Sequence, residues 1–235
     1  MEVGLVGLGK MGFNLALNLS EHGIQVIGYD PSTDARNKLN KEGIPTCSCM
    51  KSLVDKLPDK KVIWLMVPSG EITESCISEI KGLLKKGDIV IDAGNSNYKD
   101  SMRHAVELKE KEIQFLDVGT SGGISGARNG VCLMIGGDRK AYEFHAISEK
   151  DGCLYTRKSG SGHFMKMIHN GIEYGMMQAI GEGFQILEKS EFNYNLAEVA
   201  KNWNHGSVIR GWLMELAQKQ FTLHPGLKDI KGVVA

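Results

Sequence analysis

The stretch VGLVGLGKMG at residues 3–12 decides how the rest of the chain is interpreted. Its first half is an apolar run typical of a buried strand, and its second half is a glycine-rich turn that opens a helical pattern. A lone GxGxxG pattern is weak, but a strand before it and a helix after it supply the context that it requires. Free N–H groups at the start of such a helix favour a diphosphate. The turn therefore predicts a dinucleotide site formed by Gly7, Leu8, Gly9, Lys10, Met11 and Gly12.

The next apolar stretch, residues 24–30, ends in Asp30, where the dinucleotide fingerprint expects an acid. A carboxylate there accepts hydrogen bonds from the adenosine ribose hydroxyls and repels a 2′-phosphate. The following residue is Pro31, not an arginine that could clamp such a phosphate. We therefore expect NAD to be preferred over NADP. The alternative interpretation is that Asp30 only neighbours a helix N-cap.

Strand-like and helical stretches alternate through the first 157 residues. The expected strands are residues 3–9, 24–30, 60–67, 88–94, 113–119 and 131–137. The expected helices are residues 11–22, 71–85, 99–111 and 139–150, and one more opens after Pro31. This alternation predicts a mostly parallel sheet covered by helices on both faces. Beyond Thr156 the pattern is helical, over residues 160–188 and 196–220. We therefore predict a Rossmann-type α/β domain at residues 1–158, followed by an all-α domain at residues 159–235.

The composition argues against several classes of protein. Lys and Arg together number 28, as do Asp and Glu, so no net charge attracts the chain to nucleic acid or a lipid surface. No apolar run approaches the roughly 18 residues of a membrane span, and the first strand leaves no room for a signal peptide. The five cysteines lack metal-ligand spacing and fit reduced thiols in a cytoplasmic protein. We expect no metal site and neither a membrane nor a nucleic-acid partner.

The segment KMIHNGIEYGMMQ, residues 166–178, has the pattern of a helix with an unusual polar stripe. Lys166, Asn170 and Glu173 fall on one line of this helix, with His169 and Tyr174 on its margins. A solvated helix face is the simpler interpretation of such a stripe. Against it, the polar groups are chemically varied, and the two glycines of the segment cost a helix about 1 kcal/mol each. The stripe is therefore a candidate site.

Five motifs together resemble the 6-phosphogluconate dehydrogenases. They are GLGKMG, DAGNSNYKDS, DVGTSGG, GHFMKMIHNGIEYGMMQ and GSVIRGWL, in the order seen in that family. The string KMIHNGIEYG within the fourth motif is the specific part, whereas the glycine turn and TSGG are shared with the wider β-hydroxyacid dehydrogenase group. The chain looks most like the shorter, NAD-preferring bacterial branch.

The resemblance implies oxidative decarboxylation of 6-phospho-D-gluconate to D-ribulose 5-phosphate and CO2, in the pentose phosphate pathway or gluconate metabolism. It implies NAD or NADP as cofactor, no metal, and a homodimer or larger homo-oligomer. Lys166 would be the general base and acid, and Glu173 the second acid. The implied substrate residues are Asn95, Ser121, Gly122, Gly123, His169, Asn170, Tyr174 and Arg210, and Val67 and Asn95 would complete the dinucleotide site.

The chemistry explains why a lysine and a glutamate would share one helix. Oxidising a hydroxyl β to a carboxylate needs a base, and an amine serves only if its pKa falls from about 10.4 toward 7–8. Burial and the nearby nicotinamide ring would lower the pKa of Lys166. The resulting β-keto acid loses CO2 once its ketone oxygen receives a proton, and Glu173 can then protonate the enediol carbon. Seven residues of helix separate the two groups by about 10 Å of rise.

In the family, the polypeptide continues beyond the GLKDIKGVVA of residues 226–235 into further helix and a D-x-G-x-G-x-W loop. We therefore expect an incomplete, C-terminally truncated helical domain. Two alternatives to an active 6-phosphogluconate dehydrogenase stay open. One is another β-hydroxyacid dehydrogenase acting on a small unphosphorylated acid, although Glu173 and Tyr174 argue against a simple reductase. The other is a non-catalytic fragment that binds NAD.

Overall fold

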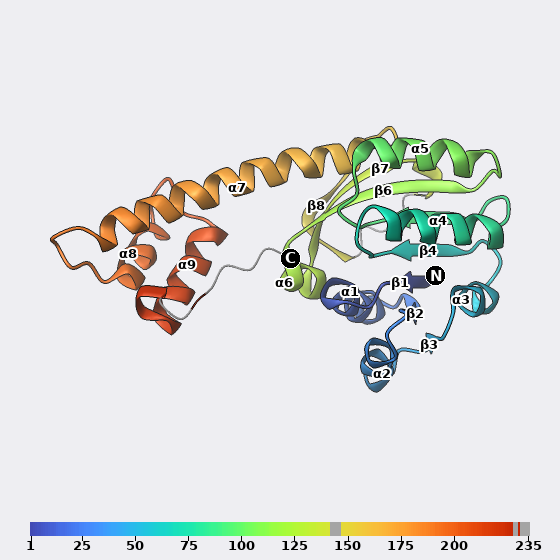
Figure 1. Ribbon diagram of the computed structural model, residues 1–235, viewed down its shortest axis with the longest axis horizontal. Coiled ribbons are helices and arrows are strands. Elements are labelled where there is room, and N and C mark those ends of the chain that lie inside the picture. The colour runs from blue at the N-terminus through green and yellow to red at the C-terminus, as the bar shows by residue number, and fades with distance from the viewer. Residues whose placement is uncertain (142–146, 228–229, 231–235) are drawn as a thin grey trace. The chain divides into compact units, whose positions relative to one another are not determined.

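Two compact units make up the chain in the computed structural model, which describes residues 1–141, 147–227 and 230. The first unit, residues 1–168, is built on an eight-stranded sheet with the order β3-β2-β1-β4-β5-β6-β7-β8 (Figure 1). Neighbouring strands are parallel, except that β6 and β7 are antiparallel. The strands are β1 (Glu2–Val6), β2 (Gln25–Tyr29), β3 (Thr46–Cys47), β4 (Val62–Leu65), β5 (Ile89–Asp92), β6 (Gln114–Ser121), β7 (Val131–Gly137) and β8 (Ser148–Arg157).

Helices cover both faces of this sheet because successive residues of its central strands point to opposite faces and both sets are apolar. Along β4, Trp64 belongs to one buried cluster, whereas Ile63 and Leu65 belong to the other. The first cluster includes side chains of α1, α2 and α6, and the second includes side chains of α3, α4 and α5. These helices are α1 (Lys10–Glu21), α2 (Thr33–Lys41), α3 (Met50–Lys56), α4 (Glu71–Leu83), α5 (Tyr98–Lys109) and α6 (Gly123–Asn129). The predicted Rossmann-type architecture is confirmed.

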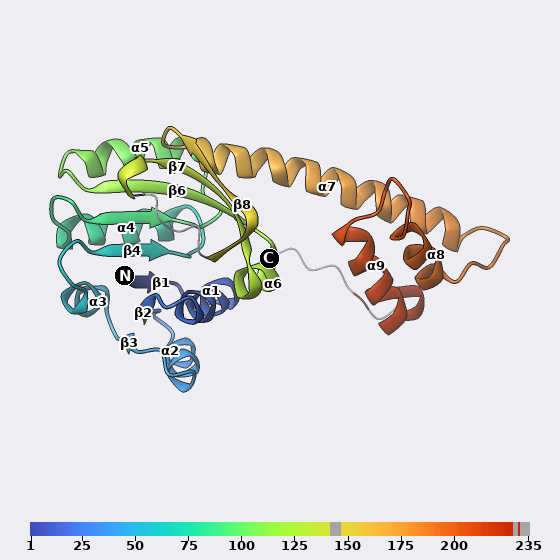
Figure 2. The same ribbon diagram turned by 180° about the vertical axis from the view of Figure 1, so that it is seen from behind.

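One predicted helix is wrong over part of its length. In place of a helix over residues 139–150, a 3-10 turn (η1, Arg139–Ala141) is followed by β8, which begins at Ser148; residues 142–146 lie outside the described ranges. Figure 2 shows β8 beside β7 at the end of the sheet. Most of its first half is exposed and carries charges, which edge strands use against unwanted pairing. Those charges gave the sequence the pattern of a solvated helix.

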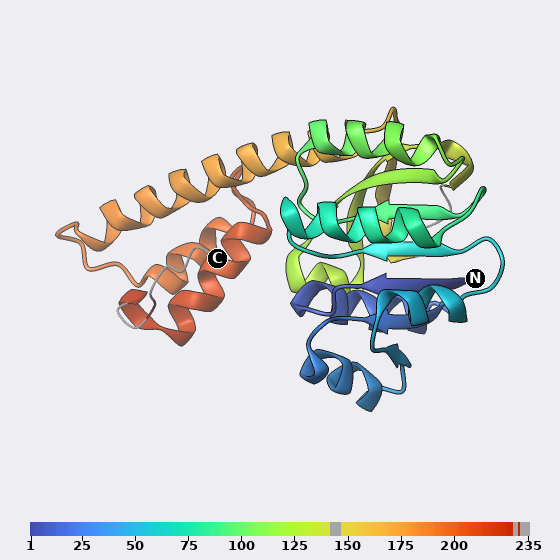
Figure 3. The same ribbon diagram turned by 45° about the vertical axis from the view of Figure 1, so that its right-hand side comes forward.

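The second unit, residues 169–235, is helical. It contains most of α7 (Ser161–Glu188), together with α8 (Leu196–Trp203), α9 (Trp212–Leu223) and the short turn η3 (Pro225–Leu227), drawn in orange and red in Figure 3. The predicted helical run over residues 196–220 is thus two helices. The small core of this unit centres on Phe184. The ring centroid of Phe184 lies 4.8 Å from that of Phe221 and 5.4 Å from that of Trp203.

The division between the two units falls within α7, at residues 168–169. The first turns of this helix belong to the sheet unit, since the backbone of Gly162 lies against the carbonyl groups of Asp117 and Met134. The predicted division at residues 158–159 separates a dinucleotide-binding domain from a substrate domain. This functional division stays a prediction. None of the helices in the described ranges has the length and apolar character that a membrane crossing requires.

Candidate active site

Apart from Lys166 on α7, the predicted site residues of the first unit lie at or just after the carboxyl ends of parallel strands. The glycine turn follows β1, Asp30 follows β2, Val67 follows β4 and Asn95 follows β5. Ser121 is the last residue of β6. Because β1, β2, β4, β5 and β6 are mutually parallel, these ends share one edge of the sheet. The chain order also reverses between β1 and β4, and such a switch point is where open α/β sheets bind dinucleotides.

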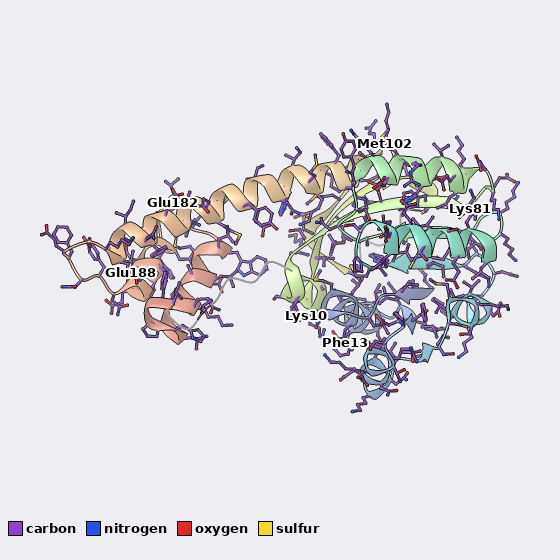
Figure 4. The ribbon with its side chains drawn as sticks, in the orientation of Figure 1. Lys10, Phe13, Lys81, Met102, Glu182 and Glu188 are labelled. Atoms are coloured by element: carbon purple, nitrogen blue, oxygen red, sulfur yellow. The ribbon has the colours of Figure 1, made fainter. Side chains whose placement is uncertain are left out.

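The glycine turn has the shape of a diphosphate cradle. A Cβ on Gly12 would lie 1.9 Å from the carbonyl oxygen of Gly7, and a Cβ on Gly7 would lie 2.3 Å from that of Met66. Both glycines therefore allow backbone contacts that no other residue permits. At Gly9, by contrast, a Cβ would meet no atom within 4 Å. Gly9 is the N-cap of α1, so its open side adjoins the unpaired N–H groups of the helix start, where Lys10 adds a positive charge (Figure 4).

Asp30 holds the adjoining loop through hydrogen bonds and also lies at the edge of the sheet where the strands end. Its Oδ2 accepts a hydrogen bond from the backbone N–H of Leu8 and its Oδ1 accepts one from that of Ser32, both at 2.8 Å. Ser32, not Asp30, is the N-cap of α2, and its hydroxyl accepts from Ala35 N–H at 3.3 Å. The N-cap-neighbour interpretation is thus correct as a description. Each carboxylate oxygen of Asp30 accepts one backbone N–H and keeps a second lone pair that a ligand can use.

Arg36, on α2, lies beside this loop and was missed by the sequence analysis. Its guanidinium donates to the carbonyl oxygens of Asp30 at 2.6 Å and Pro31 at 3.0 Å, and to the Thr33 hydroxyl at 3.0 Å. The first turn of α2 brings this cation back beside Asp30. Arg36 is six residues from Asp30, whereas the prediction considered only the residue directly after it.

The loops after β4 and β5 lie against each other. A Cβ on Gly94 would come within 2.7 Å of the Val67 carbonyl oxygen, and Gly94 N–H donates to Asp92 Oδ1 at 3.1 Å. Asn95, the next residue, is exposed. Val67 and Asn95 are thereby brought together beside the glycine turn, because Gly7 also approaches the Val67 side chain.

Ser121, Gly122 and Gly123 form a sharp turn from β6 into α6. Gly122 has φ +119° and Gly123 has φ +56°, which a residue with a side chain rarely adopts. A Cβ on Gly122 would also lie 2.9 Å from the Cα of Gly126. Gly122 is the N-cap of α6, so the first N–H groups of that helix have no partner within it, at the end of the strand that carries Ser121.

Lys166 lies directly over this strand. A Cβ on Gly119 would be 2.5 Å from the Cβ of Lys166 and 2.9 Å from the carbonyl oxygen of Gly162. The glycine at position 119 is therefore what permits the lysine to rest on β6. Ser121 is two residues further along the strand and points to the same face. The structure thus brings together Lys166 and the Ser121 turn, which were paired in the sequence only by resemblance.

The remaining polar residues of the stripe lie further along α7. His169 Nδ1 is 3.2 Å from Asn170 Oδ1 and 3.6 Å from Glu173 Oε2. The side chains of His169 and Glu173 are 37% and 42% exposed. Tyr174 is 69% exposed.

Arg210 is not on a helix but in the loop between α8 and α9, and it is exposed. A hollow of about 530 Å³ between α8 and α9 is lined by Glu215 and Lys219, among others, and includes none of the predicted site residues. Across residues 1–141, 147–227 and 230, no cluster of three or more His, Cys, Asp or Glu side chains could hold a metal ion.

Comparisons with known proteins agree with this fold. Residues 2–147 match the family described as the NAD binding domain of 6-phosphogluconate dehydrogenase, and residues 162–221 match its C-terminal domain. The YqeC protein of Bacillus subtilis is 46% identical over all of this chain and 80% of its own length. The NAD(+)-dependent, decarboxylating 6-phosphogluconate dehydrogenase of Haloferax volcanii is 40% identical over 94% of this chain and 75% of its own.

A solved structure of 6-phosphogluconate dehydrogenase from Plasmodium falciparum superposes with a TM-score of 0.85 at 32% identity, over 93% of this chain and 50% of that one. Its study includes complexes with NADP+ and with 6-phosphogluconate. A 3-hydroxyisobutyrate dehydrogenase of Salmonella typhimurium, at 20% identity and a TM-score of 0.81, shares the fold over 94% of this chain and 78% of that one. The family matches and the two relatives together show that this chain belongs to the 6-phosphogluconate dehydrogenase family.

Proposed function

We propose that the chain oxidises and decarboxylates 6-phospho-D-gluconate to D-ribulose 5-phosphate and CO2, with NAD as the preferred electron acceptor. The observation that carries the proposal is the position of Lys166 on Gly119, beside the Ser121–Gly122–Gly123 turn. In this proposal the base, the Ser121 hydroxyl and the backbone donors of the turn would act together at the edge of the sheet that holds the glycine turn. The pathway would be the pentose phosphate pathway or gluconate metabolism.

The dinucleotide fits the residues at this edge. The open side of Gly9 leaves space for a diphosphate, and Asp30 can accept from the ribose hydroxyls while it repels a 2′-phosphate. Val67 and Asn95 would line the nicotinamide side. When bound, the nicotinamide supplies the hydride acceptor.

Lys166 and Glu173 would divide the proton transfers. Neutral Lys166 takes the hydroxyl proton as the hydride leaves the carbon β to the carboxylate. The protonated amine then returns that proton to the new ketone oxygen, so that the C–C bond to the carboxylate breaks, CO2 leaves and its electron pair forms an enediol. Glu173 protonates the enediol carbon while Lys166 takes back the hydroxyl proton. Ser121, Gly122, Gly123, His169 and Asn170 would orient the substrate, and Tyr174 and Arg210 would hold its phosphate.

Turnover with NAD and with NADP, followed by the absorbance of the reduced nicotinamide and by CO2 release, tests this proposal. We expect 6-phosphogluconate to drive both signals, and Lys166→Met to abolish them. Lys189→Met, at an exposed lysine just beyond the end of α7, is the matched control and should keep full activity. Turnover by Lys166→Met at the control rate would refute the assignment of the base.

Glu173 separates this reaction from that of other β-hydroxyacid dehydrogenases, whose fold the chain shares. Because protonation at carbon by a placed acid is worth about 10²–10⁴ in rate, Glu173→Gln should slow turnover by that factor. Glu182→Gln, on the same helix (Figure 4), should not. Reduction of NAD by 3-hydroxyisobutyrate instead, without CO2, would favour the reductase alternative. NAD binding without any turnover would favour the non-catalytic one.

We also propose a cytoplasmic homodimer. Cys47, Cys49, Cys76 and Cys132 are free thiols, as in proteins of reducing compartments. On α7, apolar side chains such as Ile172 and Met176 are more than half exposed, and a second copy would remove them from water. A mass that falls to that of the monomer on dilution would support the dimer, and a monomer at all concentrations would contradict it.

A further inference from the structure

The start of α7 is held in a seat formed by β6 and β7. Three glycines make room for it. A Cβ on Gly162 would lie 2.3 Å from the Met134 carbonyl oxygen, and a Cβ on Gly136 would lie 2.8 Å from Gly162 N. The third is Gly119, beneath Lys166. The helix backbone therefore touches the strand backbone, without side chains between them that could absorb a displacement.

Asp117 lies at the bottom of this seat and is fully buried. Its Oδ1 accepts a hydrogen bond from Gly160 N–H at 2.7 Å, and its Oδ2 accepts one from His163 N–H at 3.0 Å. Gly162 N–H also donates to it. The first N–H groups of a helix have no partner within the helix. Asp117 supplies that partner from a strand more than 40 residues away in the sequence, and a carboxylate suits the positive end of the helix dipole.

The ring of His163 makes a second connection at this point. Its Nδ1 lies 2.7 Å from Ser101 Oγ, which in turn donates to the carbonyl oxygen of Asn97 at 3.3 Å. His163 is 2% exposed, so the pair is shielded from water. Since Asn97 is the N-cap of α5 and Ser101 lies on α5, the first turn of α7 is tied to β6 and to α5 at once.

Gly160, the residue before α7, is fixed as well. It has φ +88°, and a Cβ there would lie 2.6 Å from Cγ of Met102 on α5 (Figure 4). The chain can therefore enter the helix only along one path. Burial raises the pKa of Asp117, whereas the N–H donors of His163 and Gly160 lower it. The N–H donors thus partly offset the effect of burial on the pKa of Asp117, which is raised.

The spacing of residues connects this anchor to the chemistry. Asp117, Gly119 and Ser121 alternate along β6, so all three face the same side of the sheet. On α7, His163 and Lys166 are three residues apart and lie on one side of the helix. The bond between Asp117 and His163 therefore fixes the height and rotation at which Lys166 meets Gly119, two residues before Ser121.

We infer that Asp117 is a positioning residue for the reaction: it anchors the first turn of α7 and thereby holds Lys166 over Gly119 beside Ser121. The inference rests on the proposed function, in which Lys166 is the base. Asp117 itself does not touch the substrate.

The test compares Asp117→Asn with Asp88→Asn. The amide keeps the size of the side chain but presents an NH2 group to one of the N–H donors. Asp88 is the matched control because it is also fully buried and also accepts from two backbone N–H groups, those of Lys61 at 2.8 Å and Lys85 at 2.9 Å. It lies just before β5, at the opposite edge of the sheet from the site.

Both variants should lose thermal stability, but only Asp117→Asn should lose turnover. A displacement of about 1 Å in a catalytic group costs about 100-fold in rate, so we expect kcat to fall between about 10-fold and 100-fold. The KM for 6-phosphogluconate and the Kd for NADH should stay within about twofold, because neither ligand contacts Asp117. A folded Asp117→Asn protein with the same kcat as Asp88→Asn would overturn the inference.

Two measurements do not depend on activity. In the unaltered protein, the amide hydrogens of Gly160, Gly162 and His163 should exchange as slowly as those of the central strands; rapid exchange would overturn the inference even if Asp117→Asn does not fold. Acetylation of Lys166, followed by mass spectrometry relative to Lys189, should change in rate in Asp117→Asn and not in Asp88→Asn. If the unaltered protein has no 6-phosphogluconate-dependent activity, the proposed function fails, and an unchanged acetylation rate would overturn the anchor separately.

Discussion

Replacing Asp30 by serine should change which dinucleotide binds. The carboxylate of Asp30 accepts two backbone N–H groups at 2.8 Å, from Leu8 and Ser32, and still faces the expected ribose position. Serine has one shorter, uncharged acceptor and cannot span both donors. It also removes the negative charge that would repel a 2′-phosphate.

The magnitude follows from the hydrogen bonds that are lost. A hydrogen bond to a charged group contributes about 1.5–3 kcal/mol, and each 1.4 kcal/mol is tenfold in Kd. Asp30→Ser should therefore weaken NADH binding by about 10-fold to 100-fold. Binding of NADPH should be unchanged or tighter, so the ratio of the two Kd values shifts by at least about tenfold toward NADPH.

Fluorescence titration with NADH and NADPH measures both constants without requiring turnover. Asp34→Ser, at an exposed aspartate in the first turn of α2, is the control and should leave the ratio unchanged. Arg36 stays beside the loop through the Pro31 carbonyl and the Thr33 hydroxyl, so Asp30→Ser combined with Arg36→Ala should lose any gain for NADPH. An unchanged ratio in folded Asp30→Ser would refute the role of this carboxylate in cofactor choice.

Three further predictions test separate parts of the structure. Gly9→Ala should leave the melting temperature unchanged, since its Cβ meets no protein atom, but should weaken NADH binding in a titration because the diphosphate needs that space. Iodoacetamide should label Cys49 before Cys76, because hydrogen bonds at the start of α3 lower the pKa of Cys49 while burial raises that of Cys76; mass spectrometry of partly labelled protein would show the reverse order if this is wrong. The Arg103 hydrogen bond lowers the pKa of Glu74, so its stabilisation is present above the unfolded-state pKa and is lost as pH falls through the folded one. In acid unfolding experiments, Glu74→Gln should therefore flatten the loss of stability below about pH 4 by no more than about 1 kcal/mol, and an unchanged curve would contradict the pair's contribution.

The features predicted well from the sequence are those set by local patterns. The helix expected over residues 11–22 is α1, and the apolar strands from β1 to β7 lie where expected, apart from the two-residue β3. The sequence signals for these elements come from consecutive residues. They are apolar runs for the strands, and a glycine turn that indicates a dinucleotide site when it stands between a strand and a helix. The short helices α3 and α6 were missed because seven residues are too few for a clear period.

The features that were missed depend on residues far apart in the chain. Asp117 is an ordinary strand residue in the sequence, and nothing near it indicates that it accepts from Gly160 and His163. Arg36 faces the Asp30 loop only because α2 folds back on it. In both cases the partner is a backbone N–H or carbonyl group. Such groups do not depend on residue type, so these contacts leave no sequence motif.

The polar stripe of α7 has two interpretations that the sequence left open, a solvated face and a site. If the stripe were the solvated face, its side chains would be the exposed ones and the apolar side chains would be buried. In the structure the apolar side chains are exposed too, because Ile172 is 61% exposed and Met167 47%, while within the stripe His169 is 37% and Tyr174 69% exposed. Burying such an apolar side chain stabilises a protein by about 1.5–3 kcal/mol, so the exposed apolar side of α7 favours a helix whose polar stripe is more than a solvated face. The rotation of α7 is instead set at its first turn, where Lys166 must rest on Gly119, and the apolar side is left for another surface to cover.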